Sequence, residues 1–548
     1  MDNDKNVTPT NQSGNMYSYQ EEQKDQKEPG FEQGAIRRSL GEGNPNVTPE
    51  LQINNNIINI MNNEGALHQN SIVIQVDQSP PLYWMLFASF VVVQIIFLIF
   101  FACYYDWDTL NHPTSIDDDN DKESKEKIAK NYVSLQEINI IIFLGFGFLR
   151  SFLKHYSWTS LVLTFIAGIL SFEFGLFLLI CWSSIFQKKW SNGIFNFEYL
   201  LNANYCSATI IISLGAVLGK LTFPQYFIMI FIEVIFSTFN FILLRQKLKI
   251  IDIGGALTVH LFGSLFGGIF SLVSSFRNNE KERIRNSPHF GSNYNSNIFA
   301  LFGCLILITY WPSFNTSLID ESKQKFKGII NTYLSILGSI VGTFCISPIC
   351  NQGKIKIKDI INSFFSGGII IAGCCHIINK FWSSILLGVI CGGLTTFLCN
   401  ILSYKLNEKG YHDTSDIFYF HGIPGFLGGI ITTFFVGNLT KKEDDKIYKN
   451  EIYPYIGTLL NITFIEDNNA TLNISDYAAI HFGSIFITIG ISIASAFLAG
   501  FIINICNCYL ALRYFNDSEF FNVNDTEPFP WDDERVELQV RYNSRLGT

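Results

Sequence analysis

The chain has 548 residues, of which 48% are hydrophobic, 15% are aromatic and only 16% are charged. A soluble protein of this length needs more charge, so this composition and the mean hydropathy of +0.23 favour a protein embedded in a bilayer. The net charge of -9 argues against a nucleic-acid partner, which would require a basic face.

The N-terminal 81 residues are polar, acidic overall and rich in Asn and Gln, and they contain almost no aromatic side chains. Such a segment cannot bury enough apolar surface to offset its ordering entropy. We therefore expect residues 1–81 to form a disordered tail. They carry no signal-peptide pattern, because the first apolar run begins only at about Pro81.

Apolar runs alternate with short polar links from residue 82 to about residue 508. Each run has roughly the 17–25 residues that a helix needs to cross ~30 Å of hydrocarbon. We predict an all-α membrane protein with a transmembrane domain over 82–508 and a second tail over 509–548. Its twelve transmembrane helices are expected at about 82–104, 137–153, 158–184, 199–219, 223–245, 254–275, 296–313, 327–347, 362–379, 382–404, 416–436 and 477–508.

The long polar loop 437–476 carries three N-glycosylation sequons, at Asn461, Asn469 and Asn473. If these are used, the loop lies outside the cytosol, and with twelve helices both tails are cytosolic. Basic residues occur in loops on both sides, so the positive-inside rule gives no orientation of its own.

Most of the cysteines lie within the apolar runs and form neither a CxxC pair nor a His/Cys metal spacing. Buried thiols behave as small apolar side chains, so we infer no disulfide framework, no zinc site and no cofactor. The sequence also shows no nucleophile–base constellation and no phosphate loop, which argues against an enzyme.

Two apolar runs carry the same motif, Asp-x7-His-x6-Gly-Gly-Ile. The first copy starts at Asp252 and contains His260, and the second starts at Asp413 and contains His421. By our numbering, the copies lie on the sixth and the eleventh predicted helix, so the two helices cross in opposite directions. This pattern is typical of an inverted repeat, whose functional site lies near the midplane of the membrane.

Eight residues of helix rise about 12 Å, so histidines placed this far from opposite faces of a ~30 Å core meet near mid-depth. A single histidine on an apolar helix is commonly a packing residue. Two matched copies favour function, because intramembrane ionisable groups usually line a pathway. For Asp252 and Asp413, helix capping and an electrostatic role both stay open.

These motifs resemble the ammonium transporter superfamily, and specifically its Rh glycoprotein branch. The resemblance covers about residues 82–530. Its most specific pieces are GFGFLRSFL (145–153), NANYCSATIIISLGAVLGK (202–220), DIGGALTVHLFGSLFG (252–267), YWPSFN (310–315), NTYLSI (331–336) and FHGIPGFLGG (420–429).

The resemblance implies a homotrimer in which each subunit has eleven core helices around a narrow pore, with an inverted five-helix repeat and one added N-terminal helix. The paired pore histidines of the family fall on His260 and His421. The aspartate near the outer end of the pore falls on Asp252. The two stacked phenylalanines that gate the outer mouth fall on Tyr205 and Phe314.

Some positions depart from the family pattern. Asn204 and Tyr205 stand where Rh proteins usually have Asp and Phe, and Phe241 stands where many members carry a vestibule acid. Both changes remove negative charge from the mouth, and whether they and Tyr205 weaken the recruitment of ammonium stays open. Larger or charged residues precede the second histidine and are expected to narrow the inner side; they are Asp416, Phe418 and Tyr419.

The function implied is a channel or transporter for ammonia or ammonium, with methylamine as an analogue, in a multi-pass protein of the lipid bilayer. The membrane is the plasma membrane or an endomembrane such as that of contractile vacuoles or vesicles. Alternatives are a carbon dioxide channel and a non-conducting membrane scaffold or sensor. The presence of both His260 and His421 counts against the last alternative.

Overall fold

The computed structural model describes residues 80–107, 118–153, 156–188, 190, 193–195, 197–221, 223–274, 291–319, 322–409, 411–439 and 474–509. All of them belong to the unit Pro80–Thr548, the second of two units into which the chain divides. The sequons at Asn461, Asn469 and Asn473 and nearly all of the two predicted tails lie outside the described residues. Glycosylation and the nature of the tails therefore stay predictions.

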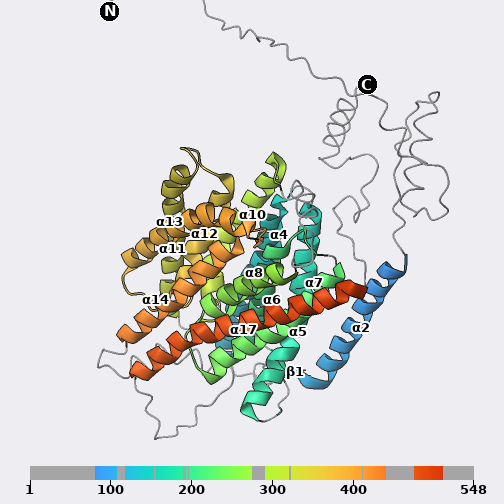
Figure 1. The fold of residues 1–548 in the computed structure, drawn as a ribbon. Coiled ribbons are helices and arrows are strands. Elements are labelled where there is room, and N and C mark those ends of the chain that lie inside the picture. Colours follow the sequence, from blue (N-terminus) through green and yellow to red (C-terminus); the bar gives the residue numbers. More distant parts are fainter. Residues whose placement is uncertain are drawn as a thin grey trace, which may run out of the picture. The chain divides into compact units, whose positions relative to one another are not determined.

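Helices make up nearly all of the described structure (Figure 1). Two three-residue strands, β1 (Tyr105–Trp107) and β2 (Gly193–Phe195), pair in parallel. Short π-helices are η3 (Ile140–Gly145), η5 (Leu243–Lys247), η6 (Ala256–Leu261) and η9 (Phe418–Gly422), and η4 (Arg150–Phe152) is a 3-10 helix. The α-helices are α2 (Pro80–Tyr104), α3 (Asp118–Asn139), α4 (Phe146–Leu149), α5 (Ser157–Gln187), α6 (Phe197–Val217), α7 (Phe223–Ile242), α8 (Phe262–Ser274), α10 (Tyr294–Thr316), α11 (Ser322–Cys350), α12 (Ile357–Ile370), α13 (Phe381–Glu408), α14 (Ile423–Leu439) and α17 (Ile474–Tyr509).

Within the described ranges, ten helical segments are long and apolar enough to cross a membrane. They coincide with ten of the predicted helices, and the class of all-α membrane protein is confirmed. An eleventh predicted helix, 82–104, coincides with α2, whose segment Phe90–Tyr104 is a shorter apolar helix. The ten segments are Ala129–Phe152, Ser157–Gln187, Phe197–Val217, Phe223–Lys247, Ala256–Ser274, Tyr294–Thr316, Ser322–Cys350, Phe381–Glu408, Phe418–Asn438 and Tyr477–Ile505.

The predicted helix 362–379 is wrong in its extent, because α12 has 14 residues and ends at Ile370. The chain then runs through consecutive turns whose carbonyl groups find partners outside the helix. Gly254 N donates to Ala372 O at 2.9 Å, and Asn331 Nδ2 donates to Cys375 O and Ile378 O at 2.9 Å each. These bonds satisfy backbone groups that a continuous helix would have paired internally.

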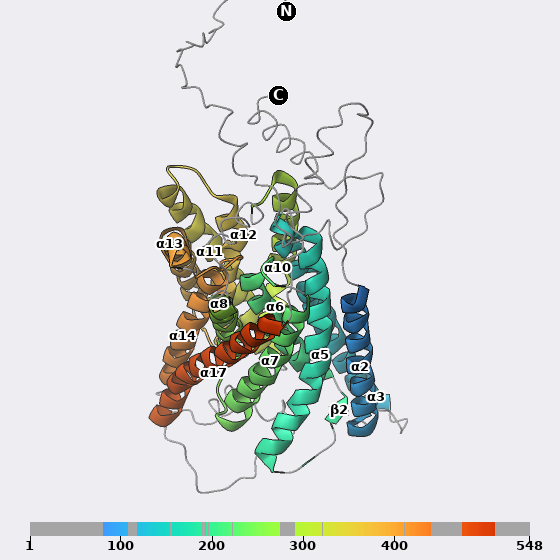
Figure 2. The ribbon, with the colours of Figure 1, turned by 45° about the vertical axis from the view of Figure 1, so that its right-hand side comes forward.

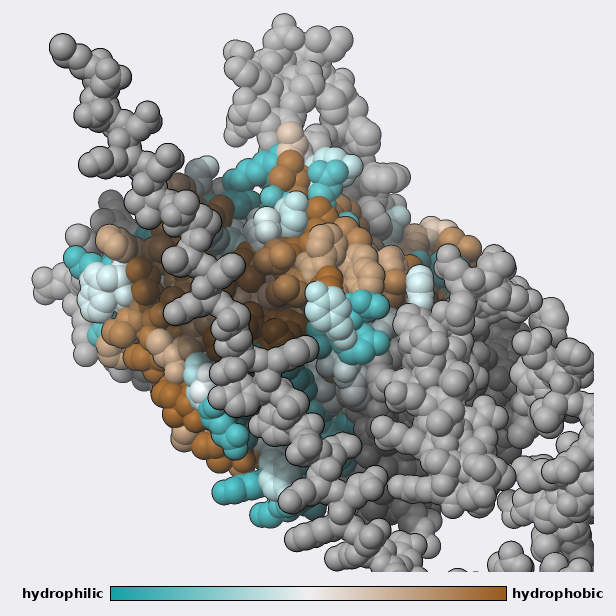
Figure 3. All heavy atoms as spheres, turned by 90° about the horizontal axis from the view of Figure 1, so that it is seen from above, coloured by the Kyte–Doolittle hydropathy of each residue, from teal (hydrophilic) through white to brown (hydrophobic). Residues whose placement is uncertain are grey.

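The helices gather into packed groups. In Figures 1 and 2, α11, α12 and α13 lie together, α2 lies alongside α5, and α17 crosses over α7 and α8. Aromatic and aliphatic side chains fill the space between them. Many large apolar side chains also face outward, and brown hydrophobic residues cover a broad area of the face shown in Figure 3. An apolar exterior of this kind suits contact with lipid.

Small residues bring α11 and α13 into backbone contact. A Cβ added at Gly388 or at Gly392 would collide with the carbonyl oxygen of Ser335 or of Ser339, respectively. In turn, Ser339 Oγ donates to Ser363 O of α12. In a bilayer the lipid tails are as apolar as the helix surfaces, so the hydrophobic effect does not drive helices together. Close packing of backbones drives their association instead.

Gly388→Ala is expected to lower the free energy of unfolding by about 1–3 kcal/mol, because its methyl group forces two backbones apart. Gly490→Ala in α17 is the matched control, because a Cβ there meets open space. Thermal unfolding of both variants in detergent measures the difference. Equal midpoints for the two variants would show that the α11–α13 contact is not tight.

Candidate functional site

The two motif histidines meet in the interior. Nδ1 of His260 lies 3.3 Å from Nδ1 of His421, and the side chains are 0% and 4% exposed. The proximity predicted from the repeat is therefore observed. Because a hydrogen bond needs one donor and one acceptor, two neutral rings in this arrangement must be complementary tautomers. We call these two residues the histidine pair.

Each histidine lies in a π-helical turn at the start of its helix, His260 in η6 and His421 in η9. Such turns are rare and are frequent at functional sites. Both turns follow a residue with left-handed backbone, Gly255 at φ +72° and Asp416 at φ +57°. These two residues occupy the same register, each three positions after the motif aspartate. The local backbone thus repeats along with the sequence.

Both motif aspartates cap the turn that carries their histidine. The carboxylate of Asp252 accepts hydrogen bonds from Leu257 N (3.2 Å), Thr258 N (2.8 Å) and Thr258 Oγ1 (2.8 Å). Asp413 Oδ2 accepts one from Phe418 N at 2.8 Å. Both aspartates therefore bond the amide five residues onward, and this observation establishes the capping role that the sequence left open.

Aromatic rings enclose the histidine pair. Trp311 stacks on His260 with ring centroids 5.5 Å apart and an interplanar angle of 24°. Phe365 lies against His421 at 4.3 Å, and Phe146 lies 6.5 Å from the same ring. Such walls offer a small solute few polar partners besides the imidazole nitrogens.

Tyr205 and Phe314, which we call the gate pair, lie on one side of the histidine pair. Their ring centroids are 4.6 Å apart with an interplanar angle of 33°, and Phe314 lies 6.0 Å from His260. The Tyr205 hydroxyl contacts Phe314 O and lies 2.9 Å from Ser317 Oγ. A phenylalanine could not make these contacts, so the tyrosine ties the two rings of the gate pair together.

Arg245 is a buried charge beside the gate pair that the sequence reasoning missed. Its guanidinium carbon lies 4.3 Å from the Phe241 ring centroid and 5.6 Å from that of Tyr205. Its Nη2 donates to the carbonyl oxygens of Asp252 and Ile253. Phe241, noted as the replacement of an acid, thus packs against a cation. The signal for Arg245 was its position within a predicted span, where ionisable residues are rare.

A cavity of about 60 Å³ lies on the other side of the histidine pair and reaches His421. We call it the Arg150 cavity. Arg150, also missed from the sequence, is only 4% exposed, and its guanidinium carbon lies 5.5 Å from the Phe146 ring centroid. The cavity is lined by Phe146, Leu149, Arg150, Phe152, Ser292, Asn297, Lys358, Ile361, Asn362, Phe365, Ser415, Ile417, Phe420 and His421.

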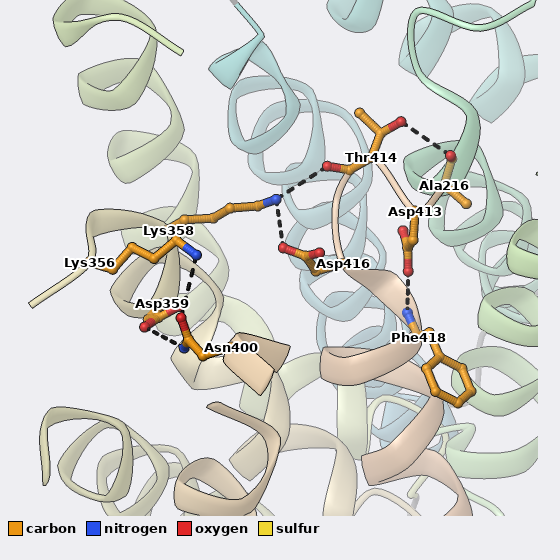
Figure 4. Close-up of polar contacts among 9 residues, drawn as sticks. All are labelled: Ala216, Lys356, Lys358, Asp359, Asn400, Asp413, Thr414, Asp416 and Phe418. Carbon is orange, nitrogen blue, oxygen red and sulfur yellow. Dashed lines mark hydrogen bonds and ion pairs between the residues drawn. The ribbon is translucent and has the colours of Figure 1, made fainter. Parts of the chain in front are cut away.

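An ion pair holds the chain beside the Arg150 cavity. Lys358 Nζ lies 2.6 Å from Asp416 Oδ2 and donates to Thr414 O at 3.3 Å (Figure 4). Thr414 is bonded in turn to the end of α6 through Ala216 O. Asp416 therefore serves an anchoring role, and its bulk at the left-handed position is tolerated because Lys358 holds its carboxylate.

Two further charges lie in loops near this anchor. Lys220 Nζ donates to Ala216 O at 2.7 Å and to His412 O at 2.7 Å. Burial lowers the pKa of Lys220 to about 7, and burial together with the Asp416 carboxylate raises the pKa of Asp413 to about 6. The segment 412–416 is thus held by buried or half-buried polar groups from several helices.

Comparison with known proteins identifies the class. Residues 118–526 match the Ammonium Transporter Family, which is most of the chain, so the protein belongs to that family. The chain is 34% identical over 309 residues to the ammonium transporter Rh type C of Xenopus laevis, which is 55% of this chain and 62% of that protein. The matched part thus spans less than two thirds of the length of that relative.

Two further relatives come from different organisms. The chain is 30% identical over 358 residues to the human ammonium transporter Rh type C, covering 64% of this chain and 73% of that protein. It is 34% identical over 357 residues to the Rhesus-like glycoprotein A of Dictyostelium discoideum, covering 63% and 66%, respectively. The resemblance to the Rh branch is therefore confirmed.

The fold has a solved counterpart in the Rh50 protein of Nitrosomonas europaea. The two structures superpose with a TM-score of 0.60 at 23% identity, over 77% of this chain and 98% of that chain. At this level of identity, the likeness supports the fold alone.

Asp252→Ala is expected to lower the free energy of unfolding by about 2 kcal/mol, because it leaves two buried amides of η6 without their acceptor. Thr258→Val is the matched control, because it removes only the hydroxyl donor and keeps both amide bonds. Thermal unfolding in detergent compares the two. A loss for Asp252→Ala no larger than for Thr258→Val would contradict the capping role.

Proposed function

We propose that this protein is a membrane channel that conducts ammonia through a pore in each subunit, at the histidine pair. The observation that carries the proposal is the 3.3 Å contact between Nδ1 of His260 and Nδ1 of His421, two buried rings on repeated motifs. Membership of the Ammonium Transporter Family and the names of the relatives, which are ammonium transporters of the Rh type, support the choice of solute.

The histidine pair suits a small neutral base. Since one Nδ1 donates to the other, one ring keeps an acceptor at Nε2 and the other keeps a donor there. Nε2 of His260 has no hydrogen-bond partner among the described residues. Ammonia both donates and accepts hydrogen bonds, so it exchanges partners along the pair without bringing a charge into the membrane, where a cation is costly.

The mouth near the gate pair favours the neutral form as well. Aromatic faces attract a cation by about 0.5–2 kcal/mol. Here, however, Arg245 places a fixed positive charge 5.6 Å from the Tyr205 ring centroid, and neither Asn204 nor Phe241 carries a negative charge. Ammonium that reaches the gate pair is therefore held weakly; it transfers its proton to water outside the gate pair, and ammonia alone enters.

The layout of the channel is part of the proposal. We place twelve helices across the bilayer in an inverted five-helix repeat with one added N-terminal helix, and three such chains form a homotrimer. The matched capping by Asp252 and Asp413 and the matched π-helical turns support the repeat. Both tails then face the cytosol, and the loop with the sequons at Asn461, Asn469 and Asn473 faces the opposite side, in the plasma membrane or an endomembrane.

His260→Ala or His421→Ala is expected to reduce ammonia and methylamine flux about tenfold. Each variant removes hydrogen-bonding groups that replace the hydration of the solute. The loss of one hydrogen bond of about 1.4 kcal/mol corresponds to a tenfold lower flux. Stopped-flow pH traces on proteoliposomes measure the flux. Size-exclusion chromatography of the same samples shows whether the assembly is retained.

His481→Gln is the matched control for these traces. Both ring nitrogens of His481 are occupied, with Thr433 Oγ1 at 3.0 Å and Ile251 O at 2.8 Å, so its loss should leave the flux unchanged. Carbon dioxide traces on the same vesicles test the gas channel. If the vesicles conduct carbon dioxide but not ammonia, carbon dioxide is the solute. If they conduct neither, the result favours a scaffold or sensor.

Tyr205→Phe is expected to raise ammonia flux up to about fivefold, because it removes a hydroxyl whose net hydrogen-bond energy of about 1 kcal/mol keeps the gate pair closed. Ser317→Ala removes one of the two partners of that hydroxyl and should give a smaller rise. The same stopped-flow measurement applies. A lower flux in Tyr205→Phe would show that the hydroxyl assists passage.

A further inference from the structure

The Arg150 cavity contains a buried cation that no carboxylate of the described residues pairs with. Arg150 is 4% exposed, and among the described residues its Nη1 has no hydrogen-bond partner. Its guanidinium carbon lies 5.5 Å from the Phe146 ring centroid. A guanidinium stays charged at any ordinary pH and has five N–H donors, so a buried Nη1 without a described partner favours an acceptor inside the cavity.

Other donors converge on the same cavity. Asn362, which is only 7% exposed, lines it, and Ser415 Oγ is buried there with no hydrogen-bond partner in the part of the chain that the structure describes. Lys358 also lines it and uses two donors, for Asp416 and for Thr414 O, out of the three that an ammonium group has. The lining is thus rich in donors to a negatively charged ligand.

The carboxylates near the cavity are each bonded to groups other than Arg150. Arg150 and Lys358 contribute two positive charges, and Asp416, paired with Lys358, contributes one negative charge. The neighbouring carboxylate of Asp359 accepts a hydrogen bond from Ser347 Oγ at 2.7 Å. It accepts a second one from Asn400 Nδ2 at 2.9 Å (Figure 4). Asp413 caps Phe418. Among the described residues, Arg150 is thus the cation of the cavity lining that has no carboxylate against it.

We infer that the Arg150 cavity binds one small monovalent inorganic anion, of the halide or bicarbonate class, between Arg150 and Lys358. The one guanidinium without a described partner, that of Arg150, favours a monovalent ligand. The volume of about 60 Å³ sets the size, because it holds a few water molecules and excludes a nucleotide or a lipid headgroup. Such an anion lies in the cavity that reaches His421. It is next to the ion pair of Lys358 with Asp416, which anchors the segment that carries this histidine.

Bromide is the probe that tests this inference, because its anomalous scattering locates it. Crystals of the full chain grown in sodium bromide are expected to show an anomalous peak within hydrogen-bond distance of the Arg150 guanidinium. In detergent, sodium bromide is expected to raise the unfolding midpoint of the wild-type protein above its value in sodium gluconate at equal ionic strength. Sodium bicarbonate is expected to act as bromide does.

Arg150→Met keeps the bulk and removes the charge, and it is expected to weaken bromide binding at least tenfold, or by about 1.4 kcal/mol. Arg150→Lys is expected to retain part of the response. Lys356→Gln is the matched control, because Lys356 is exposed on the adjoining turn, does not line the cavity and contacts Asn400 Oδ1 at 3.5 Å.

The absence of the anomalous peak, or an equal response to bromide in the wild type and in Arg150→Met, would overturn the inference. If Arg150→Met does not fold, the wild-type crystals and Arg150→Lys still decide it. None of these measurements uses transport, so the anion site and the proposed conduction of ammonia stand or fall separately.

Discussion

The Nδ1–Nδ1 contact between His260 and His421 places strong demands on the rest of the chain. Two neutral imidazoles 3.3 Å apart must be held in complementary tautomers and in a fixed orientation. Each ring is therefore fixed by a capped turn at its back and by an aromatic ring at its face, Trp311 for His260 and Phe365 for His421. Small shifts in either helix would break the contact.

Close helix packing makes this precision achievable in a protein whose exterior is apolar. Glycines and serines of α11, α12 and α13 bring backbones together, and buried hydroxyl groups bond to carbonyl oxygens across the helices. In lipid, such contacts replace the hydrophobic term that stabilises soluble bundles. The broken end of α12, tied by Asn331 and Gly254, belongs to the same framework.

The two sides of the histidine pair differ although the motif repeats. On the side of Asp252, the left-handed residue is Gly255, and Arg245 packs over Phe241 and the gate pair. On the side of Asp413, the left-handed residue is Asp416, which an ion pair with Lys358 holds in place. The repeat therefore supplies the same backbone on both sides of the histidine pair, and residues that are not repeated give the two sides different charged groups.

Hydrophobic runs and a matched motif were enough to determine the class of protein and the identity of the central residues. Run length reflects bilayer thickness, and the spacing from aspartate to histidine reflects helical rise, so both are local properties that a sequence records. They predicted ten membrane-length helices correctly and brought His260 to His421. They also extended 362–379 as a helix, because apolar residues in turns cannot be distinguished from apolar residues in a helix.

Only the tertiary structure decided which charged groups meet. Three basic residues illustrate this: Arg150 lines the same cavity as His421, Arg245 lies beside Tyr205, and Lys358 pairs with Asp416. The members of each pair are far apart in the sequence, and no repeated spacing links them. Their partners depend on how α6, α7, α10 and α12 pack, since an ion pair forms over a few ångströms and a shift of one helical turn would remove it. The sequence by itself thus determined the two histidines at the centre of the site, and tertiary packing decided which charged groups lie on either side of them.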